Sequence, residues 1–156
     1  MQLNNKQITI NDLSILVNKD GFSFCTLDQH HFLPIEEKTP TKESLKSFLD
    51  YHQLTQQEVQ LIFMDQPAVC VPSPLFEEQQ NVNYFKGAVN LPADSTFEHR
   101  SLDSLDITSI FPTNSTLISL FKEVFPSLKV NHLSAALLPL LSSFSFGKAK
   151  KNLFIH

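Results

Sequence analysis

Glycine is scarce in this sequence, and its scarcity excludes the commonest nucleotide-binding loops. Only Gly21, Gly87 and Gly147 occur among 156 residues. Backbone loops that hold phosphate need several glycines within a few positions. Neither G-x-G-x-x-G nor G-x-x-x-x-G-K-[ST] is present, so the sequence has no Rossmann or P-loop fingerprint.

Cysteine, long apolar runs and positive charge are also in short supply. Two cysteines do not make a disulfide framework, and no apolar run reaches the roughly 18 residues of a membrane span. A net charge of −4 does not favour a nucleic-acid partner, and the N-terminal segment lacks the apolar core of a signal peptide. With 42% apolar and 18% charged residues, the composition predicts a soluble, cytoplasmic, globular protein.

The first 38 residues predict three antiparallel strands. Apolar and polar residues alternate over 13–18 and again over 22–27, and Asp20-Gly21 provides the tight turn between the two runs. A second turn leads to a third run at 31–37. This order of elements is a β-meander.

The period then changes to that of a helix. Thr39-Pro40 is a typical helix start, and Leu45, Phe48, Leu49 and His52 follow on one face of a helix expected at 40–53. Further along, we expect strands and helices at the following positions: strands at 59–64, 68–71, 95–102, 105–111 and 128–130; helices at 75–79, 82–89, 117–125 and 133–144. Asn114 is interpreted as a helix cap, and His132 as the first residue of the last helix with Asn131 as its cap.

This order describes a ribonuclease H-like half-domain. The expected fold is α/β, with a mixed sheet of about five strands, the antiparallel meander first, and helices on its faces. Residues 1–147 form this domain. Residues 148–156 are interpreted as a basic linker and the first strand of a missing second half; the alternative is a tail that pairs with an existing sheet edge.

Several stretches resemble one bacterial family. Residues 12–28 (DLSILVNKDGFSFCTLD), residues 70–76 (CVPSPLF) and the strand–helix pair at 125–141 are similar to an uncharacterised domain of unknown function with an actin-like fold. Residues 153–156 (LFIH) resemble the first strand of its second half. The resemblance implies that the chain is the N-terminal half of an actin-like ATPase fold.

The same resemblance identifies a degenerate phosphate loop. In active members of the actin superfamily, an acid ends the first strand and an x-Gly-[Ser/Thr] turn follows it. Here Asn18 stands at the acid position, unless Asp20 has slipped in register, and Phe22 separates Gly21 from Ser23. We therefore interpret Asn18, Asp20, Gly21 and Ser23 as a structural turn, and expect no cofactor.

The remaining reactive residues predict neither a metal site nor a catalytic site. No two histidines have i, i+4 spacing; the six are His30, His31, His52, His99, His132 and His156. Cys25 and Cys70 lie in apolar strands and are interpreted as small hydrophobes. Carboxylate pairs such as Glu36-Glu37 are interpreted as solvated charge.

Phenylalanine is abundant and suggests how the protein acts. Six of the fourteen lie in the last third: Phe111, Phe121, Phe125, Phe144, Phe146 and Phe154. If a second half is missing, an apolar interdomain face is exposed and favours a protein partner or self-association. We expect a non-enzymatic interaction or scaffold module. The alternatives are a nucleotide-binding, ATPase-related protein completed by a second domain or chain, and a nuclease using Asp12, Asp20 and Asp65.

Overall fold

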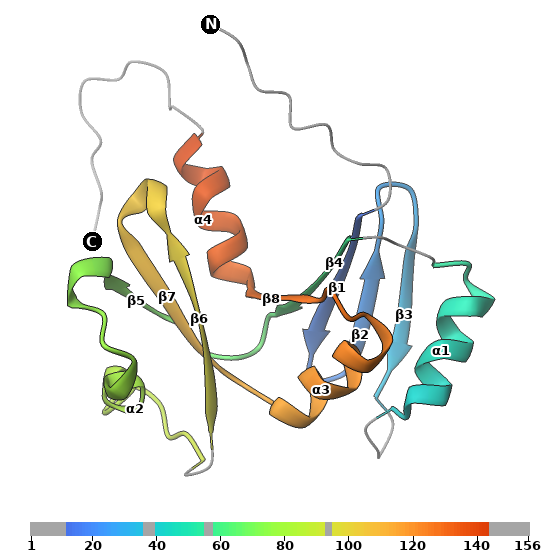
Figure 1. Ribbon diagram of the computed structural model, residues 1–156, viewed down its shortest axis with the longest axis horizontal. Helices are drawn as coiled ribbons and strands as arrows, with labels where there is room; N and C mark the ends of the chain where they lie inside the picture. Colours follow the sequence, from blue (N-terminus) through green and yellow to red (C-terminus); the bar gives the residue numbers. More distant parts are fainter. Residues whose placement is uncertain (1–11, 36–39, 55–57, 93–94, 144–156) are drawn as a thin grey trace, which may run out of the picture.

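Two β-sheets and the helices packed against them make up the protein (Figure 1). The computed structural model describes residues 12–35, 40–54, 58–92 and 95–143. The strands are β1 (Asp12–Asn18), β2 (Gly21–Cys25), β3 (His30–Pro34), β4 (Glu58–Phe63), β5 (Val69–Pro72), β6 (Thr96–Leu102), β7 (Ile107–Thr113) and β8 (Lys129–His132). The helices are α1 (Lys42–Tyr51), α2 (Asn81–Tyr84), α3 (Ser115–Val124) and α4 (Leu133–Ser143), with 3-10 turns η1 (Ser73–Leu75), η2 (Glu78–Gln80) and η3 (Asp103–Leu105).

The large sheet has the order β3-β2-β1-β4-β8 and is mixed. β1, β2 and β3 pair antiparallel, whereas β4 runs parallel to both β1 and β8. The predicted meander and the mixed five-stranded sheet are therefore confirmed.

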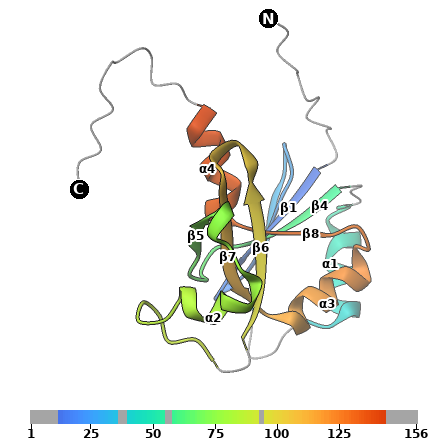
Figure 2. The same ribbon diagram turned by 60° about the vertical axis from the view of Figure 1, so that its left-hand side comes forward.

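The main core lies on one face of the large sheet. Alternate residues of β1, Leu13, Ile15 and Val17, are buried there, as the period of two in the sequence predicts. Both α1 and α3 pack on this face, through Leu45 and Phe121 among others (Figure 2). Burial of these apolar side chains is the main source of stability for the pair of helices.

The small sheet has the order β5-β7-β6 and lies between β4 and α3 in the sequence. Its own core joins Val71, Phe85 and Ile110 with partly buried aromatic side chains. The Arg100 Nε donates to the Val130 carbonyl oxygen at 2.9 Å, which ties β6 to β8. The sequence predicted these strands but not their separation into a second sheet.

Several expected element boundaries are wrong. Helix α1 begins after Thr41, whose hydroxyl accepts from the Ser44 amide while the Ser44 hydroxyl accepts from the Thr41 amide, so the cap is not Thr39. His132 ends β8, and α4 begins one residue later. The helices expected at 75–79 and 82–89 are reduced to single turns.

Helix α4 contacts both β8 of the large sheet and β6 of the small sheet (Figure 1). None of the helices that the structure describes has the length and apolar character needed to cross a membrane. The proposed boundary at 147 and the segment 148–156 lie outside the described residues.

Candidate functional site

The β1–β2 turn lies at the edge where the parallel strands end. β1 ends at Asn18 and its neighbour β4 at Phe63, with Val17 opposite Phe63. Open α/β sheets bind ligands outside the carboxyl ends of their parallel strands. A nucleotide site of this fold would therefore be presented at this edge.

Side chains of the protein engage the turn amides that a phosphate would need. The Asn18 Oδ1 accepts from the Asp20 amide at 3.0 Å and from the Gly21 amide at 2.9 Å. The Lys19 amide donates to the Asp65 carboxylate, which follows β4. Three consecutive donors are thus committed, and an anion would have to displace both Asn18 and Asp65 to bind them.

The close approach of β3 accounts for Gly21. A Cβ atom at this position would lie 2.4 Å from the Leu33 carbonyl oxygen and 2.9 Å from the Pro34 Cα. Real Cβ atoms do not come so close to backbone, and the φ of +157° also disfavours a side chain. The need for glycine here comes from sheet packing, without reference to a ligand.

Ser23 lies apart from the other three candidate residues. It is inside β2, opposite Leu16 of β1 and Phe32 of β3, and the fully buried Phe22 separates it from the turn. The structure therefore brings Asn18, Asp20 and Gly21 together and places Ser23 along the strand.

The three acidic residues of the nuclease alternative, Asp12, Asp20 and Asp65, do not lie at one site. Asp20 and Asp65 flank the carboxyl edge, but Asp12 begins β1 at the opposite end of the strand. Within residues 12–35, 40–54, 58–92 and 95–143, no group of three or more His, Cys, Asp or Glu side chains is placed to hold a metal ion. A two-metal nuclease needs such a group.

His132 belongs to the same edge, which the sequence did not indicate. It is buried, and its Nδ1 lies 3.1 Å from the Ser134 amide, which can only donate. The ring proton is therefore on Nε2, which donates to the Gln66 carbonyl oxygen at 2.9 Å. This hydrogen bond links the end of β8 to the residues that follow β4. The His132 ring and the Gln66 carbonyl group at this edge therefore already have protein partners.

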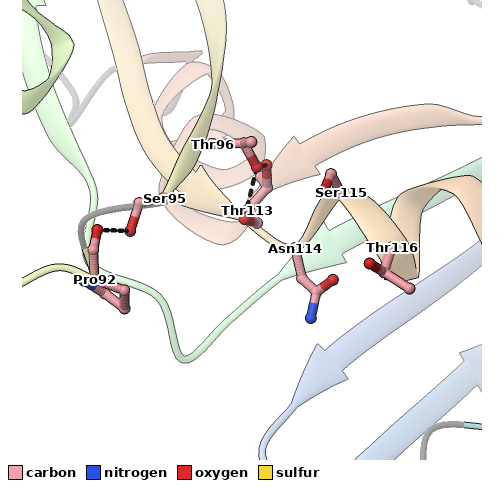
Figure 3. A pocket seen from close by; sticks show the side chains of 7 residues that line it. All are labelled: Pro92, Ser95, Thr96, Thr113, Asn114, Ser115 and Thr116. Atoms are coloured by element: carbon pink, nitrogen blue, oxygen red, sulfur yellow. Dashed lines mark hydrogen bonds between the residues drawn. The ribbon is translucent and has the colours of Figure 1, made fainter.

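A polar pocket of about 340 Å³ lies at the N-terminus of α3 (Figure 3). None of the seven described residues that line it is charged; they are Pro92, Ser95, Thr96, Thr113, Asn114, Ser115 and Thr116. Asn114 caps the helix as expected, its Oδ1 accepting from the Leu117 amide at 3.0 Å.

Two hydroxyls of the pocket already have protein partners. Ser95 donates to the Pro92 carbonyl oxygen at 2.7 Å, and Thr96 to the Thr113 carbonyl oxygen at 2.9 Å (Figure 3). Their hydroxyls stabilise the loop before β6 and the end of β7. The pocket combines two distant segments, which is why sequence spacing did not reveal it.

Cys25 does not have the setting of an activated thiol. Cys25 and Cys70 are both free, and burial raises the pKa of the Cys25 thiol. A raised pKa disfavours the thiolate, which is the nucleophilic form. Cys25 is half-buried and is compatible with the small-hydrophobe interpretation, whereas Cys70 is exposed on β5, so that interpretation is wrong for Cys70.

Helix α4 has three exposed leucines on one face. Leu137, Leu140 and Leu141 are 43%, 57% and 58% exposed and follow the i, i+3, i+4 spacing of one helix face. We call these three residues the α4 leucine stripe. Of the six phenylalanines in the last third, Phe111 and Phe121 are fully buried and Phe125 is partly buried against the main core. The three after Ser143 lie outside the described residues.

Comparisons with known proteins support the fold. A solved structure from Bacteroides thetaiotaomicron VPI-5482, described as a protein with actin-like ATPase fold and unknown function, is similar with a TM-score of 0.66 and 19% sequence identity. The match covers 93% of this chain and 60% of that one, so this chain spans about three-fifths of its length. No curated protein matches. The model of a family described as "Protein of unknown function (DUF3822)" matches residues 1–156.

Proposed function

We propose that this chain, which belongs to the DUF3822 family, is a non-enzymatic protein-interaction module built on one lobe of the actin-like ATPase fold. The observation that carries the proposal is the engagement of three consecutive turn amides by Asn18 and Asp65. A cytoplasmic location, in which both cysteines stay reduced, is part of the same proposal.

Asn18 supports the loss of phosphate chemistry in two ways. Its carboxamide carries no charge, so Asn18 does not supply the carboxylate that ends this strand in active members of the actin superfamily. Its Oδ1 oxygen also accepts hydrogen bonds from the Asp20 and Gly21 amides of the same turn. The same residue thus removes one group that nucleotide binding requires and occupies two others.

The α4 leucine stripe is the proposed interaction face. We assign to it a second lobe, in the same polypeptide or in another chain, because the similar solved structure continues well beyond the part that matches here. Helix α4 is the last element that the structure describes.

The nucleotide part of the proposal is tested by the thermal stability of the chain with magnesium and ATP. A ligand at one hundred times its Kd stabilises the native state by about 2.7 kcal/mol, which raises Tm by several degrees. We expect no change in Tm at millimolar MgATP or MgADP. A saturable rise in Tm would refute the proposal and favour the nucleotide-binding alternative.

The interaction part is tested by sedimentation equilibrium of the chain over a wide concentration range. An uncovered stripe favours self-association, and Leu137→Ser with Leu141→Ser should weaken it at least tenfold in Kd, since each buried leucine contributes about 1 kcal/mol or more. The control is Leu75→Ser, at a leucine that is 68% exposed elsewhere. A monomer at all concentrations, or equal effects of the stripe and control variants, would contradict the assignment.

The alternative, a nucleotide-binding ATPase-related protein, has one supporting observation. The similar solved structure is described by an actin-like ATPase fold. Under this alternative the turn would have to open when a second lobe binds. Binding of MgATP by a longer protein that contains both lobes, but not by this chain, would favour it.

A further inference from the structure

A serine hydroxyl lies against a histidine ring where β8 passes into α4. The Ser134 Oγ is 2.8 Å from the His132 Nδ1. This distance is within the reach of about 2.6–3.2 Å that separates a nucleophile from its base in activated sites. The pair lies at the carboxyl end of β8, the edge at which open α/β sheets place their reactive groups.

The tautomer of the ring fixes the direction of this hydrogen bond. Nδ1 of His132 accepts from the Ser134 amide at 3.1 Å, and Nε2 donates to the Gln66 carbonyl oxygen at 2.9 Å. Nδ1 therefore carries no proton, so the Ser134 hydroxyl is the donor in its contact with the ring. The hydroxyl proton thus points at the basic nitrogen of a neutral imidazole.

These groups supply the three parts of an activated nucleophile. Such sites are recognised by a hydroxyl in hydrogen-bond contact with a base and by a third group that orients the base. Here Ser134 provides the hydroxyl, His132 the base and Gln66 the orienting carbonyl oxygen. The same carbonyl oxygen would stabilise the imidazolium that forms when Nδ1 takes the proton, because hydrogen bonds from a charged donor are the stronger ones.

The place of Ser134 on α4 also favours reaction. It is the second of the eleven residues of this helix, so it lies at the positive end of the helix dipole, which stabilises negative charge on a reacting oxygen. Its side chain is half-buried, and it precedes Leu137 and Leu141 by three and seven positions, on the same side of α4. A small reagent can therefore approach from the side of the α4 leucine stripe.

We propose that Ser134 is a nucleophilic acceptor site for activated acyl groups, with His132 as its general base. The Ser134 Oγ forms a bond to the carbonyl carbon of an activated ester or thioester, and the bond from that carbon to the leaving oxygen or sulfur breaks. The hydroxyl proton passes to Nδ1 of His132 and from there to the leaving group. The products are an O-acyl serine and an alcohol or thiol.

The acyl group should remain on Ser134. Its removal would need a water molecule at Nδ1, but His132 is only 6% exposed and its Nδ1 still accepts from the Ser134 amide. The expected reaction is therefore the modification of one equivalent of protein without turnover. This goes beyond the proposed function, because it adds a covalent modification site to a non-enzymatic interaction module.

The test is acetylation of the untagged chain by p-nitrophenyl acetate, with the modified serines identified and timed by mass spectrometry of peptides. Ser142 is the matched control within the wild-type chain. It is on the same helix and is more exposed, but its hydroxyl donates to the Pro139 carbonyl oxygen, which cannot take a proton. We expect Ser134 to be acetylated at least about a hundredfold faster than Ser142, since a positioned general base contributes about 10²–10⁴ in rate.

His132→Asn separates the base from the helix cap. The asparagine oxygen can accept the same hydrogen bonds from Ser134 but cannot take its proton, so acetylation of Ser134 should slow at least about a hundredfold. Circular dichroism confirms that the variant is folded, and the comparison of the two serines in the wild type does not depend on it. Equal rates at Ser134 and Ser142 would overturn the proposal. A wild-type rate in folded His132→Asn would do so as well, as would release of nitrophenol well beyond one equivalent.

Discussion

Replacement of Gly21 by alanine tests whether the close approach of β3 is the reason that the β1–β2 turn has a glycine at this position. The added Cβ would lie 2.4 Å from the Leu33 carbonyl oxygen, 2.7 Å from the Phe32 Cζ and 2.9 Å from the Pro34 Cα. Rotation of Phe32 relieves one contact. The other two involve the backbone of β3, which can move only if its pairing with β2 is disturbed.

The size of the effect follows from two costs. Overpacking that forces a backbone shift costs about 1–3 kcal/mol. A side chain at a sparsely populated φ, here +157°, costs about 1–3 kcal/mol more. We expect a loss of about 3 kcal/mol in the free energy of unfolding, a large part of the roughly 5–15 kcal/mol of a domain.

Urea unfolding followed by circular dichroism measures this loss. For a small protein, about 3 kcal/mol lowers the midpoint by about 1–2 M. Gly87→Ala is the matched control, because Gly87 also has a positive φ, +83°, but nothing lies within 4 Å of its added Cβ. The control should lose only about 1 kcal/mol. Equal losses in the two variants would refute the packing argument and leave the positive φ alone as the reason for Gly21.

Three further predictions concern the turn, the first helix and pH. Asn18→Ala removes the acceptor of two turn amides and should lower the free energy of unfolding by about 2 kcal/mol in urea titration; no change would mean that water replaces Asn18 fully. Thr41→Ala removes the cap of α1 and should cost about 1 kcal/mol by the same assay, whereas a neutral effect would place the cap elsewhere. The pKa of His52 is lowered on folding, so the unfolded chain binds the proton more readily, and stability should fall as pH drops below about 6.5. In His52→Gln that part of the pH dependence should disappear, and an unchanged profile would contradict the assignment.

Local pattern was sufficient to predict the large sheet and its helices. Alternation at Leu13, Ile15 and Val17 gave the buried face of β1, and Asp20-Gly21 gave the hairpin. The helical period around Leu45 gave α1. These elements were predictable because each buries one face against the same core, so burial and local period agree.

What local pattern missed depends on contacts between distant segments. The strand expected at 105–111 continues in the structure through Pro112, which lies inside β7. It is tolerated because β5 pairs with β7 only as far as Ile110, so beyond that residue β7 has a single neighbour, β6. The contact between His31 and His52 needs both a strand and a helix in place, although each residue was individually expected on its element.

The small sheet is inserted in the sequence between two neighbouring strands of the large sheet, and this insertion has a consequence for folding. β4 and β8 are adjacent in the large sheet, but 65 residues lie between Phe63 and Lys129. Closing so long a loop carries a large entropic cost, which falls if the intervening residues first gather around their own core of Val71, Phe85 and Ile110. The meander needs only local contacts and can form early. We therefore expect β8 to dock last, which makes its carboxyl end, where α4 begins, the latest part of the sheet to become ordered.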